Sequence, residues 1–461
     1  MTNVRSWISV ILLIVASLIL KLIEIGTNDL AHDEPFTVLQ AHRSIAGLFK
    51  ILPEENNPPL HFLFMHFWVK LVPLEAGWLR LPSAIFSALL VWPLFRIGKH
   101  LENFRVALIA SLLFLFSNYH LGFAHEVRAY SLFALLATVS IWQLLRVING
   151  RSIFLLALVN VLMIYTHFFG WLMIGIQLLC VLLLKEWRKD FRQFLKVLLI
   201  CGIAYLPYAY IFIARVSTSI GEGTWLDPPS IEEPYNMIWR WSNAPVAAAI
   251  LIVVILIHLI RSKAAELLTR LSLIWTFVPL SGMFLISFFI PMYLDRYLIY
   301  ASPGFFLLSA MALNSILPNV RWNWLPPAIV IMIMIFTFHL RNVSWPQPSE
   351  VVRSVEDLKP SEQTPIFIHP WWYAHSYAWH LDKELLTDPD RLIENLEQRS
   401  IHPIHDTGEI DDKLLPGMQM IVVVAGAEEE RRFSEYLSAG TVTSIKSIQP
   451  DLHVRVHLLE R

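Results

Sequence analysis

Two adjacent carboxylates and three arginines far apart in the chain are the residues that could carry out chemistry here. Asp33 and Glu34 follow the first long apolar run. The arginines stand beside later apolar runs, at Arg80, Arg128 and Arg296. A carboxylate can take the proton of a hydroxyl as a general base, and a guanidinium group can bind two phosphate oxygens at once. The set therefore predicts a site that combines a base with an anion-binding group.

A structural interpretation of the acidic pair competes with the chemical one. Asp33 and Glu34 could cap and open a helix that runs to Phe49, because the helix dipole favours acidic side chains at its N-terminus. Pro35 fits the first turn of such a helix. Taken with the motifs below, Asp33 is the preferred base. Three roles stay open for Glu34: it could orient that base, bind a cation or be solvated.

The basic candidates have an alternative role as membrane anchors. Arg128 could extend its charged head to the interface while its stem lies in the bilayer. Arg80 and Arg296 could equally be interface anchors, and Lys70 is better explained as interfacial than as catalytic. Anion binding by these residues requires that the chain bring them to one face of the membrane.

Composition places the chain among proteins that cross a membrane many times. Of its 461 residues, 56% are hydrophobic and 16% are charged, and the mean hydropathy is +0.53. Soluble domains are far more polar. The net charge of -1, with no basic stripe and no glycine-rich phosphate loop, argues against a nucleic-acid partner. Cys180 and Cys201 lie inside apolar runs and predict no disulfide framework.

Apolar runs of about the length that spans a bilayer organise the first three quarters of the sequence. They predict about eleven transmembrane helices, near 7–25, 81–97, 105–123, 129–147, 152–166, 168–184, 197–214, 244–260, 271–291, 297–316 and 324–340. A shorter run, 58–72, begins with two prolines and carries His61, His66 and Lys70. We expect this run to lie in the membrane plane. The first run is expected to remain as an uncleaved anchor.

The distribution of positive charge predicts the orientation. With 58–72 in the plane, the lysine- and arginine-rich connections at 96–105 and 185–196 fall on the same side as Arg5. The positive-inside rule makes that side, with the N-terminus, cytoplasmic. The C-terminal tail then lies outside the cytoplasm. We expect a bacterial inner membrane, because no compartment-retention signal is visible.

The outer side is expected to collect the chemically unusual residues. Besides the acidic pair and the arginines, it receives four candidates for contacts with an acceptor: Asn57, His61, Glu126 and His167. The long outer loop 215–243, which carries Glu222, Trp225 and Glu233, is expected to shape the choice of acceptor. Loops on one face of a rigid helical scaffold are where binding sites tend to be built.

The segment 342–461 is expected to form a small α/β domain, separate from a transmembrane domain at 1–341. Its charge density rises, and Pro346 and Pro348 mark the boundary. Strands are predicted at 365–369, 418–425, 441–448 and 453–459, and helices at 371–380 and 428–437. Four histidines of this segment are expected at its surface: His375, His380, His402 and His405.

Five motifs in a fixed order give the sequence a family resemblance. They are Asp33-Glu34, Asn57-Pro58-Pro59-Leu60, Arg80-Leu81-Pro82-Ser83-Ala84, Glu126-Val127-Arg128-Ala129-Tyr130, and Arg296-Tyr297 followed by Pro303. Their order and spacing over most of 1–310 resemble the GT-C glycosyltransferases. The nearest branch is family 39, with the protein O-mannosyltransferases and the aminoarabinose transferase of lipid A. The chain departs from that pattern at Asn57, where related enzymes have His or Lys. The resemblance therefore does not define the identity of the acceptor.

The resemblance implies a fold and a reaction. The fold is a mostly α membrane protein of the GT-C type, a polytopic helical bundle with in-plane helices in the first outer loop and a small C-terminal α/β soluble domain. Family members move a hexosyl or pentosyl group from a polyprenyl-phosphate donor to an acceptor hydroxyl outside the cytoplasm, usually with inversion. By resemblance, Asp33 with Glu34 acts as base or orients the acceptor. The residues implied on the donor side are Arg128, Arg80, Arg296, Tyr130 and Lys70.

The expected partners are a lipid-linked sugar donor, the membrane, and a glycolipid, glycan or protein acceptor. No cofactor is certain, and a divalent cation held by His61 and Glu34 is an open alternative. A zinc site needs three or four converging ligands, and the sequence has no HExxH or comparable spacing.

Two other functions compete with an enzyme. A transporter or flippase for a lipid-linked or anionic substrate predicts ionisable residues in the middle of helices and an inverted repeat, and the sequence shows neither clearly. A non-catalytic scaffold whose tail binds a partner leaves the ordered acidic and arginine motifs unexplained.

Overall fold

The computed structural model of the chain divides into two compact units. It describes residues 2–55, 57–221, 226–262, 266–317, 321–340, 345–413, 417–438 and 442–461. The first unit, called the helical unit here, comprises Met1–Glu24, Phe49–His61 and Arg80–Leu340. The second, called the mixed unit, comprises Ile25–Leu48, Phe62–Leu79 and Arg341–Arg461. Glu222 and Trp225, expected to contact an acceptor, lie outside the described residues.

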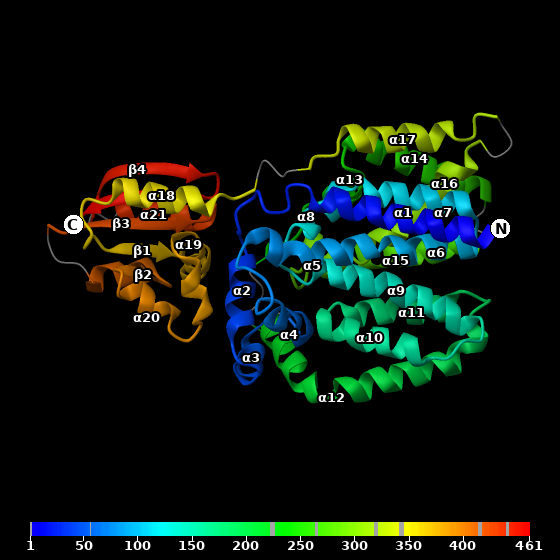
Figure 1. Cartoon of the computed structure of the whole chain (residues 1–461), viewed down its shortest axis with the longest axis horizontal. Helices are drawn as coiled ribbons and strands as arrows, with labels where there is room; N and C mark the ends of the chain where they lie inside the picture. Colours follow the sequence, from blue (N-terminus) through cyan, green and yellow to red (C-terminus); the bar gives the residue numbers. More distant parts are fainter. Residues whose placement is uncertain are drawn as a thin grey trace. The chain divides into compact units, whose positions relative to one another are not determined.

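A helix lies in every apolar run that the sequence marks as a span (Figure 1). These helices are α1 (Thr2–Leu22), α5 (Ala76–Leu89), α6 (Val91–Leu101), α7 (Phe104–Leu115), α8 (Asn118–Ala124), α9 (Tyr130–Ile148), α10 (Phe154–Thr166), α11 (Gly170–Leu183), α12 (Phe191–Gly221), α14 (Pro245–Ser262), α15 (Leu267–Ile286), α16 (Ser302–Ser315) and α17 (Leu325–Phe336). One more helix, α13 (Glu233–Ser242), lies in the predicted loop 215–243. Short 3-10 turns join some of them: η1 (Leu52–Glu54), η2 (Arg188–Asp190) and η3 (Asp295–Leu298).

The lengths of these helices suit an integral membrane protein. Among the described residues, four helices are long and apolar enough to cross a bilayer, and up to six are if each bent pair counts as one span. The bent pairs are α7 with α8, at 60°, and α13 with α14, at 102°. The expected number of about eleven spans stays a prediction. The run 58–72 forms a helix of only 10 residues, α4 (Pro59–Trp68), which is too short to cross a bilayer.

Helix α16 is the centre of the helical unit. It packs against α7, α14 and α15, and every residue from 302 to 313 is buried. A Cβ atom at Gly304 would lie 2.7 Å from Thr276 Oγ1 and 3.1 Å from the side chain of Trp275, so only glycine permits this approach of α15 to α16. The Trp275 indole then donates to the Tyr300 carbonyl at 2.8 Å. This close packing fixes the first turn of α16 against α15.

A buried amide network joins three helices of the same unit. Asn160 on α10 donates to Gln177 Oε1 on α11 at 3.0 Å, and Gln177 Nε2 donates to Asn160 Oδ1 and to Ser140 Oγ on α9, both at 3.0 Å. All three residues are buried. In an apolar surround, such mutual hydrogen bonds specify how neighbouring helices align.

The mixed unit contains a five-stranded sheet in the order β2-β1-β3-β5-β4 (Figure 1). Its strands are β1 (Ile366–His369), β2 (Ile401–Pro403), β3 (Gln419–Ala425), β4 (Thr443–Asp451) and β5 (Val454–Glu460). The strands β2, β1 and β3 are parallel, and β5 and β4 run antiparallel to their neighbours. The expected small C-terminal α/β fold is therefore present, with β2 as a strand that the sequence did not signal.

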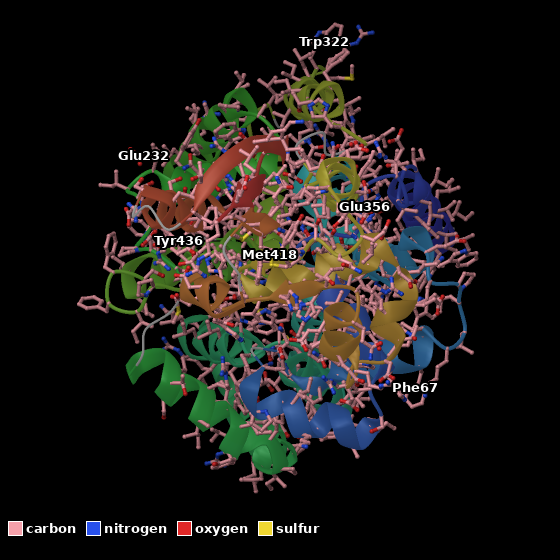
Figure 2. The ribbon with its side chains drawn as sticks, turned by 90° about the vertical axis from the view of Figure 1, so that its left-hand side faces the viewer. Phe67, Glu232, Trp322, Glu356, Met418 and Tyr436 are labelled. Carbon is pink, nitrogen blue, oxygen red and sulfur yellow. The ribbon has the colours of Figure 1, made fainter. Side chains whose placement is uncertain are left out.

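Alternating side chains of the central strands build the core of this sheet. Met420, Val422 and Val424 of β3 lie in one cluster with Phe433 of α21 (Ala427–Ser438). The partly buried Met418 and Tyr436 pack against this cluster (Figure 2). Other helices and turns of the domain are α18 (Pro348–Leu358), η4 (Trp371–Tyr373), α19 (Ala374–Leu381), η5 (Lys383–Thr387), α20 (Leu392–Glu397) and η6 (Thr407–Lys413).

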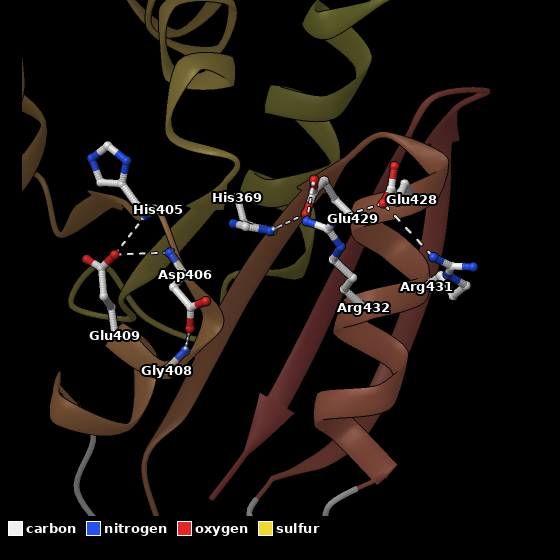
Figure 3. A network of polar contacts seen from close by, with 9 residues as sticks. All are labelled: His369, His405, Asp406, Gly408, Glu409, Glu428, Glu429, Arg431 and Arg432. Carbon is white, nitrogen blue, oxygen red and sulfur yellow. Dashed lines mark hydrogen bonds and ion pairs between the residues drawn. The ribbon is translucent and has the colours of Figure 1, made fainter. Parts of the chain in front are cut away.

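A polar network closes the carboxyl ends of β1 and β3 (Figure 3). The His369 imidazole at the end of β1 lies 2.9 Å from Glu429 Oε2 in the first turn of α21. Arg432 bridges Glu428 and Glu429 one turn later. Acidic groups at a helix N-terminus are stabilised by the helix dipole, so this network ties α21 to β1.

Two expectations about local structure are wrong. The helix expected to run from the acidic pair to Phe49 is broken into α2 (Glu34–His42) and α3 (Ile45–Ile51), because Arg43 takes an extended conformation with φ -61° and ψ 153°. His375, expected at the surface, is 7% exposed. All residues of the short helix α19 from 374 to 379 are buried, so no alternation of buried and exposed positions marks His375 in the sequence.

We expect the amide network to stabilise the helical unit through paired groups. Replacing Gln177→Leu leaves the Asn160 amide without the two hydrogen bonds described above and should lower the free energy of unfolding by about 1 kcal/mol. The double variant Asn160→Leu/Gln177→Leu should lose less than the sum of the single losses, because no buried amide is left unpaired. Unfolding in detergent measures both, and strictly additive losses would contradict the network.

Candidate active site

The acidic pair lies at the start of α2 in the mixed unit. Asp33 is half-buried at the N-cap position, yet its side chain makes no capping hydrogen bond. Its main-chain oxygen accepts instead from Thr37 N and Oγ1, at 3.1 and 3.0 Å. His32, just before it, has φ 53°, a left-handed conformation that is strained for a side chain of this size. Strained backbone conformations of this kind cluster at functional sites. Helix capping therefore does not account for the Asp33 carboxylate.

Glu34 has a structural use that its neighbour lacks. It is buried, at 1% exposure, and its Oε2 atom accepts from the Ala31 main-chain N–H at 3.2 Å. The carboxylate reaches back over the turn and satisfies an amide that would otherwise be lost at the helix start. The Glu34 carboxylate thus stabilises the turn that carries Asp33. A direct catalytic role for it stays a prediction.

The helical unit brings two of the predicted arginines to one aromatic ring. The guanidinium carbons of Arg128 and Arg296 each lie 5.9 Å from the ring centroid of Tyr130. Arg296 also lies 5.8 Å from the ring of Tyr297. Arg128 is 8% exposed and Tyr130 is buried. An aromatic face attracts such cations, and a guanidinium group can also bind oxygen acceptors.

Two of the predicted histidines surround this pair of arginines. Burial, with a smaller contribution from the charge of Arg128, lowers the pKa of His61 to about 3. Burial, with smaller contributions from Arg128 and Arg296, lowers the pKa of His167 to about 3. Both rings are therefore neutral near pH 7 and add no charge of their own. His167 stacks on Phe133 with ring centroids 4.8 Å apart.

Contacts between neighbouring segments of the helical unit hold the arginines in place. Arg80 is 1% exposed in the first turns of α5, and Ser83 Oγ, one turn later, donates to the Arg128 carbonyl at 3.4 Å. Tyr119 on α8 donates from its hydroxyl to the Asp295 carbonyl at 2.6 Å. Residues from four connections, near 61, 128, 167 and 296, thus meet on this part of the helical unit. His61, Arg128, His167 and Arg296 thus lie close together within the helical unit. The side of the membrane on which they lie stays a prediction.

A polar cavity of about 400 Å³ opens beside Asp295, the residue before Arg296. It is lined by Pro228, Pro229, Ser230, Glu233, Arg240, Tyr293, Leu294 and Asp295. Glu233 and Arg240 form an ion pair at 3.0 Å, and the Tyr293 hydroxyl donates to the Glu233 carbonyl at 3.1 Å. Part of the predicted acceptor loop therefore lines a cavity together with residues 293–295, which directly precede Arg296 in the chain.

Lys70 belongs to the mixed unit and is bound to a histidine there. Its ammonium group donates to His66 Nε2 at 2.7 Å, while His66 Nδ1 donates to the Ala41 carbonyl at 2.9 Å. It also lies 5.8 Å from the ring of the exposed Phe67 (Figure 2). The structure gives Lys70 a local partner within the mixed unit. A role of Lys70 in binding the donor stays a prediction.

The remaining candidates have less specific surroundings. Asn57 and Glu126 are both half-buried in the connections where the sequence placed them. Within the described part of the chain, no three His, Cys, Asp or Glu side chains are gathered closely enough to hold a metal ion. The divalent cation considered for His61 and Glu34 therefore has no ligand set among these residues.

Sequence reasoning missed a buried lysine. Lys21 is 1% exposed at the end of α1, where its ammonium group donates to Ser17 Oγ at 3.0 Å and lies 4.9 Å from the ring of Phe114. His125 donates to its carbonyl at 2.9 Å. A signal was available, because Lys21 is the one charged residue between positions 7 and 22. Its place at a helix end made it resemble an ordinary interface lysine.

Comparisons with known proteins identify the fold. Residues 56–211 match the family model described as dolichyl-phosphate-mannose-protein mannosyltransferase. ArnT from Cupriavidus metallidurans in the apo state superimposes with a TM-score of 0.63 at 12% identity, covering 99% of this chain and 98% of that chain. The same protein bound to undecaprenyl phosphate gives a TM-score of 0.61 at 12% identity, covering 97% of both chains.

A third solved structure extends the comparison to another kingdom of life. The archaeal oligosaccharyltransferase AglB from Archaeoglobus fulgidus, in complex with an inhibitory peptide and a dolichol-phosphate, gives a TM-score of 0.56 at 11% identity. The match covers 90% of this chain and 69% of that chain. No curated protein matches at the level of sequence. The expected GT-C fold and the likeness to family 39 are thereby confirmed.

The buried histidines predict how acid destabilises the helical unit. In the unfolded chain a histidine has a pKa of about 6.5, whereas His61 and His167 in the folded protein have pKa values of about 3. Between these values the unfolded state binds more protons, so stability should fall as the pH is lowered from 7 toward 4. His167→Gln should reduce this dependence of the melting temperature on pH in detergent.

The exposed histidine variant His339→Gln serves as the matched control and should leave the pH dependence as in the wild type. An unchanged slope in His167→Gln would contradict the assignment of a neutral, buried imidazole at this position.

Proposed function

We propose that this chain, a GT-C-fold protein similar to the family 39 enzymes, is a membrane glycosyltransferase that takes its sugar from a polyprenyl-phosphate donor. The observation that carries the proposal is the approach of Arg128 and Arg296 to one ring, Tyr130, beside two neutral histidines. Guanidinium groups gathered at one ring form a positively charged site, and guanidinium geometry matches phosphate oxygens. A phosphodiester at the membrane interface is an anion of the right size.

The arginines would act on the leaving group. In the transition state, negative charge grows on the phosphate oxygen that departs from the anomeric carbon. Guanidinium groups already in place stabilise this charge, and one such donor in a water-poor site is worth roughly 3–4 kcal/mol. Arg80, buried in α5, would add to the positive field. The polyprenyl tail would stay in the bilayer while the phosphate lies at the interface, as anionic headgroups do.

Asp33 would act on the acceptor. Its carboxylate takes the proton of the acceptor hydroxyl while that oxygen attacks the anomeric carbon, and the bond from carbon to the phosphate oxygen breaks. The electron pair leaves with polyprenyl phosphate, and one displacement inverts the anomeric centre. A support for this role is the absence of a capping bond from Asp33 at the start of α2.

The cavity beside Asp295 would receive part of the acceptor. Its walls combine an ion pair with a tyrosine and main-chain groups, and such polar surfaces suit a molecule rich in hydroxyl groups. A glycolipid, a glycan or a glycosylated protein would each present such a group. We further propose that the N-terminus is cytoplasmic and the C-terminal domain extracytoplasmic, in a bacterial inner membrane.

Substitution of the proposed base separates this enzyme from a transporter. Asp33→Asn removes the proton acceptor at constant size and should lower transfer from a polyprenyl-phosphate sugar by 10²- to 10⁴-fold. Binding of undecaprenyl phosphate should be unchanged, because no guanidinium group is altered. The assay follows release of polyprenyl phosphate by the purified protein with a panel of sugars and acceptors.

Arg128→Gln is the complementary variant, and it should weaken undecaprenyl phosphate binding. Wild-type transfer by Asp33→Asn would remove this residue from the reaction. Movement of intact donor across vesicles without any transfer would favour the transporter.

The cavity predicts a selective effect on the acceptor. Glu233→Gln breaks the ion pair with Arg240 inside the cavity and should raise the acceptor KM about tenfold, with the donor KM unchanged. Glu232→Gln, an exposed neighbour outside the cavity lining, is the matched control and should leave both constants unchanged. Equal changes in donor and acceptor KM would contradict an acceptor site here.

A further inference from the structure

We infer that the C-terminal domain holds the Asp33 turn in its working position, with His380 as a positioning residue. The inference rests on the proposed function, because it gives a purpose to precise placement of Asp33. It concerns contacts inside the mixed unit alone, where residues 25–48 and the C-terminal domain lie together.

Three hydrogen bonds from the C-terminal domain grip the chain just before the acidic pair. The Trp345 indole donates to the Asp29 carbonyl at 2.8 Å, and the Ser349 main-chain N–H donates to Asp29 Oδ2 at 2.8 Å. His380 Nε2 donates to the Leu30 carbonyl at 2.9 Å. The donors stand more than 300 positions away in the sequence, so they fasten a local turn to a distant part of the chain.

A second set of contacts holds the chain just after the pair. Helix α19 packs against α2, and the ring centroids of His375 and Phe36 lie 5.5 Å apart. Burial lowers the pKa of His375 to about 4, although the Trp372 main chain and the Asp33 charge oppose this shift. His375 is therefore neutral near pH 7, and its ring packs against Phe36 in the first turn of α2.

The two sets of contacts, together called the clamp here, lie on either side of a strained turn. This strain explains why the turn needs support from other parts of the chain. His32 has φ 53° and packs its ring on Trp345 with centroids 5.4 Å apart. A left-handed residue of this kind persists only where its surroundings hold it. A general base must lie within about an ångström of its best position to act fully. Loops that lack such support open locally.

The same unit offers a contact that serves as a control. Arg43, just after α2, forms an ion pair with Asp390, which is 84% exposed. Exposed ion pairs add little to stability. This contact also joins the first outer loop to the C-terminal domain, but it lies beyond the far end of α2 from Asp33. Loss of the Arg43–Asp390 ion pair tests whether weakening any contact between residues 25–48 and the C-terminal domain displaces the Asp33 turn.

Hydrogen exchange tests the clamp without reference to activity. His380→Leu removes the donor to Leu30 and should speed exchange of main-chain amides in 28–34 by at least tenfold in the full-length protein in detergent. His380→Gln keeps an N–H group near the same place and should restore most of the protection. Asp390→Asn should leave exchange in 28–34 unchanged. Wild-type protection in His380→Leu would overturn the clamp.

Kinetics tests the positioning role. With the undecaprenyl-phosphate sugar that the wild type consumes, His380→Leu should lower kcat about 10- to 100-fold. The donor KM and the affinity for undecaprenyl phosphate should stay unchanged, since the arginines belong to the other unit. His380→Gln should recover most of kcat, and Asp390→Asn should match the wild type. Faster exchange with wild-type kcat in His380→Leu would overturn positioning.

The two proposals fail in different ways. If Asp33→Asn retains full transfer, the proposed base is wrong, while exchange in His380→Leu still reports on the clamp. If Asp33→Asn is inactive and His380→Leu is as active as the wild type, the base stands and the positioning role is wrong. In the double variant, loss of His380 should add nothing to the loss from Asp33→Asn, as expected for residues that act through one group.

Discussion

Positive charge held away from water is the constraint on which the helical unit depends. Arg128 and Arg296 approach one ring in a partly buried setting, where each charge has lost much of its hydration. The unit meets this cost with aromatic faces and with imidazoles that stay neutral rather than adding to the repulsion. In the proposed function, this positive charge would stabilise the departing phosphate.

The carboxylate side of the chemistry rests on a different kind of support. An acid on a surface turn is hydrated and mobile unless other groups fix its backbone. In the mixed unit, Glu34 satisfies an amide of the turn, and the C-terminal domain binds the carbonyls of Asp29 and Leu30. The strained His32 then carries Asp33 with its side chain unused by the helix that follows. In the proposed function, these contacts within the mixed unit would keep the Asp33 carboxylate in place.

Much of the architecture follows from local patterns that the sequence displays. The apolar runs are helices, and the buried strand β3 matches the continuous apolar stretch at 418–425. Such elements can be predicted because burial imposes a length and a period on consecutive residues. The short strand β2 could not be predicted, because three residues are too few to show a repeating pattern of burial. The break at Arg43 could not be predicted either, because it depends on the backbone conformation of a single residue.

By itself, the sequence determined a membrane protein with an acidic pair, ordered arginine motifs and a polar tail, because hydropathy and motif order are properties of the linear chain. Only the tertiary structure decided that Arg128 and Arg296 share Tyr130, that Lys21 and His375 are buried, and that distant residues hold the turn before Asp33. Those outcomes depend on which parts of the chain pack against each other and so become buried. Residues more than 300 positions apart have no shared pattern from which that could be read.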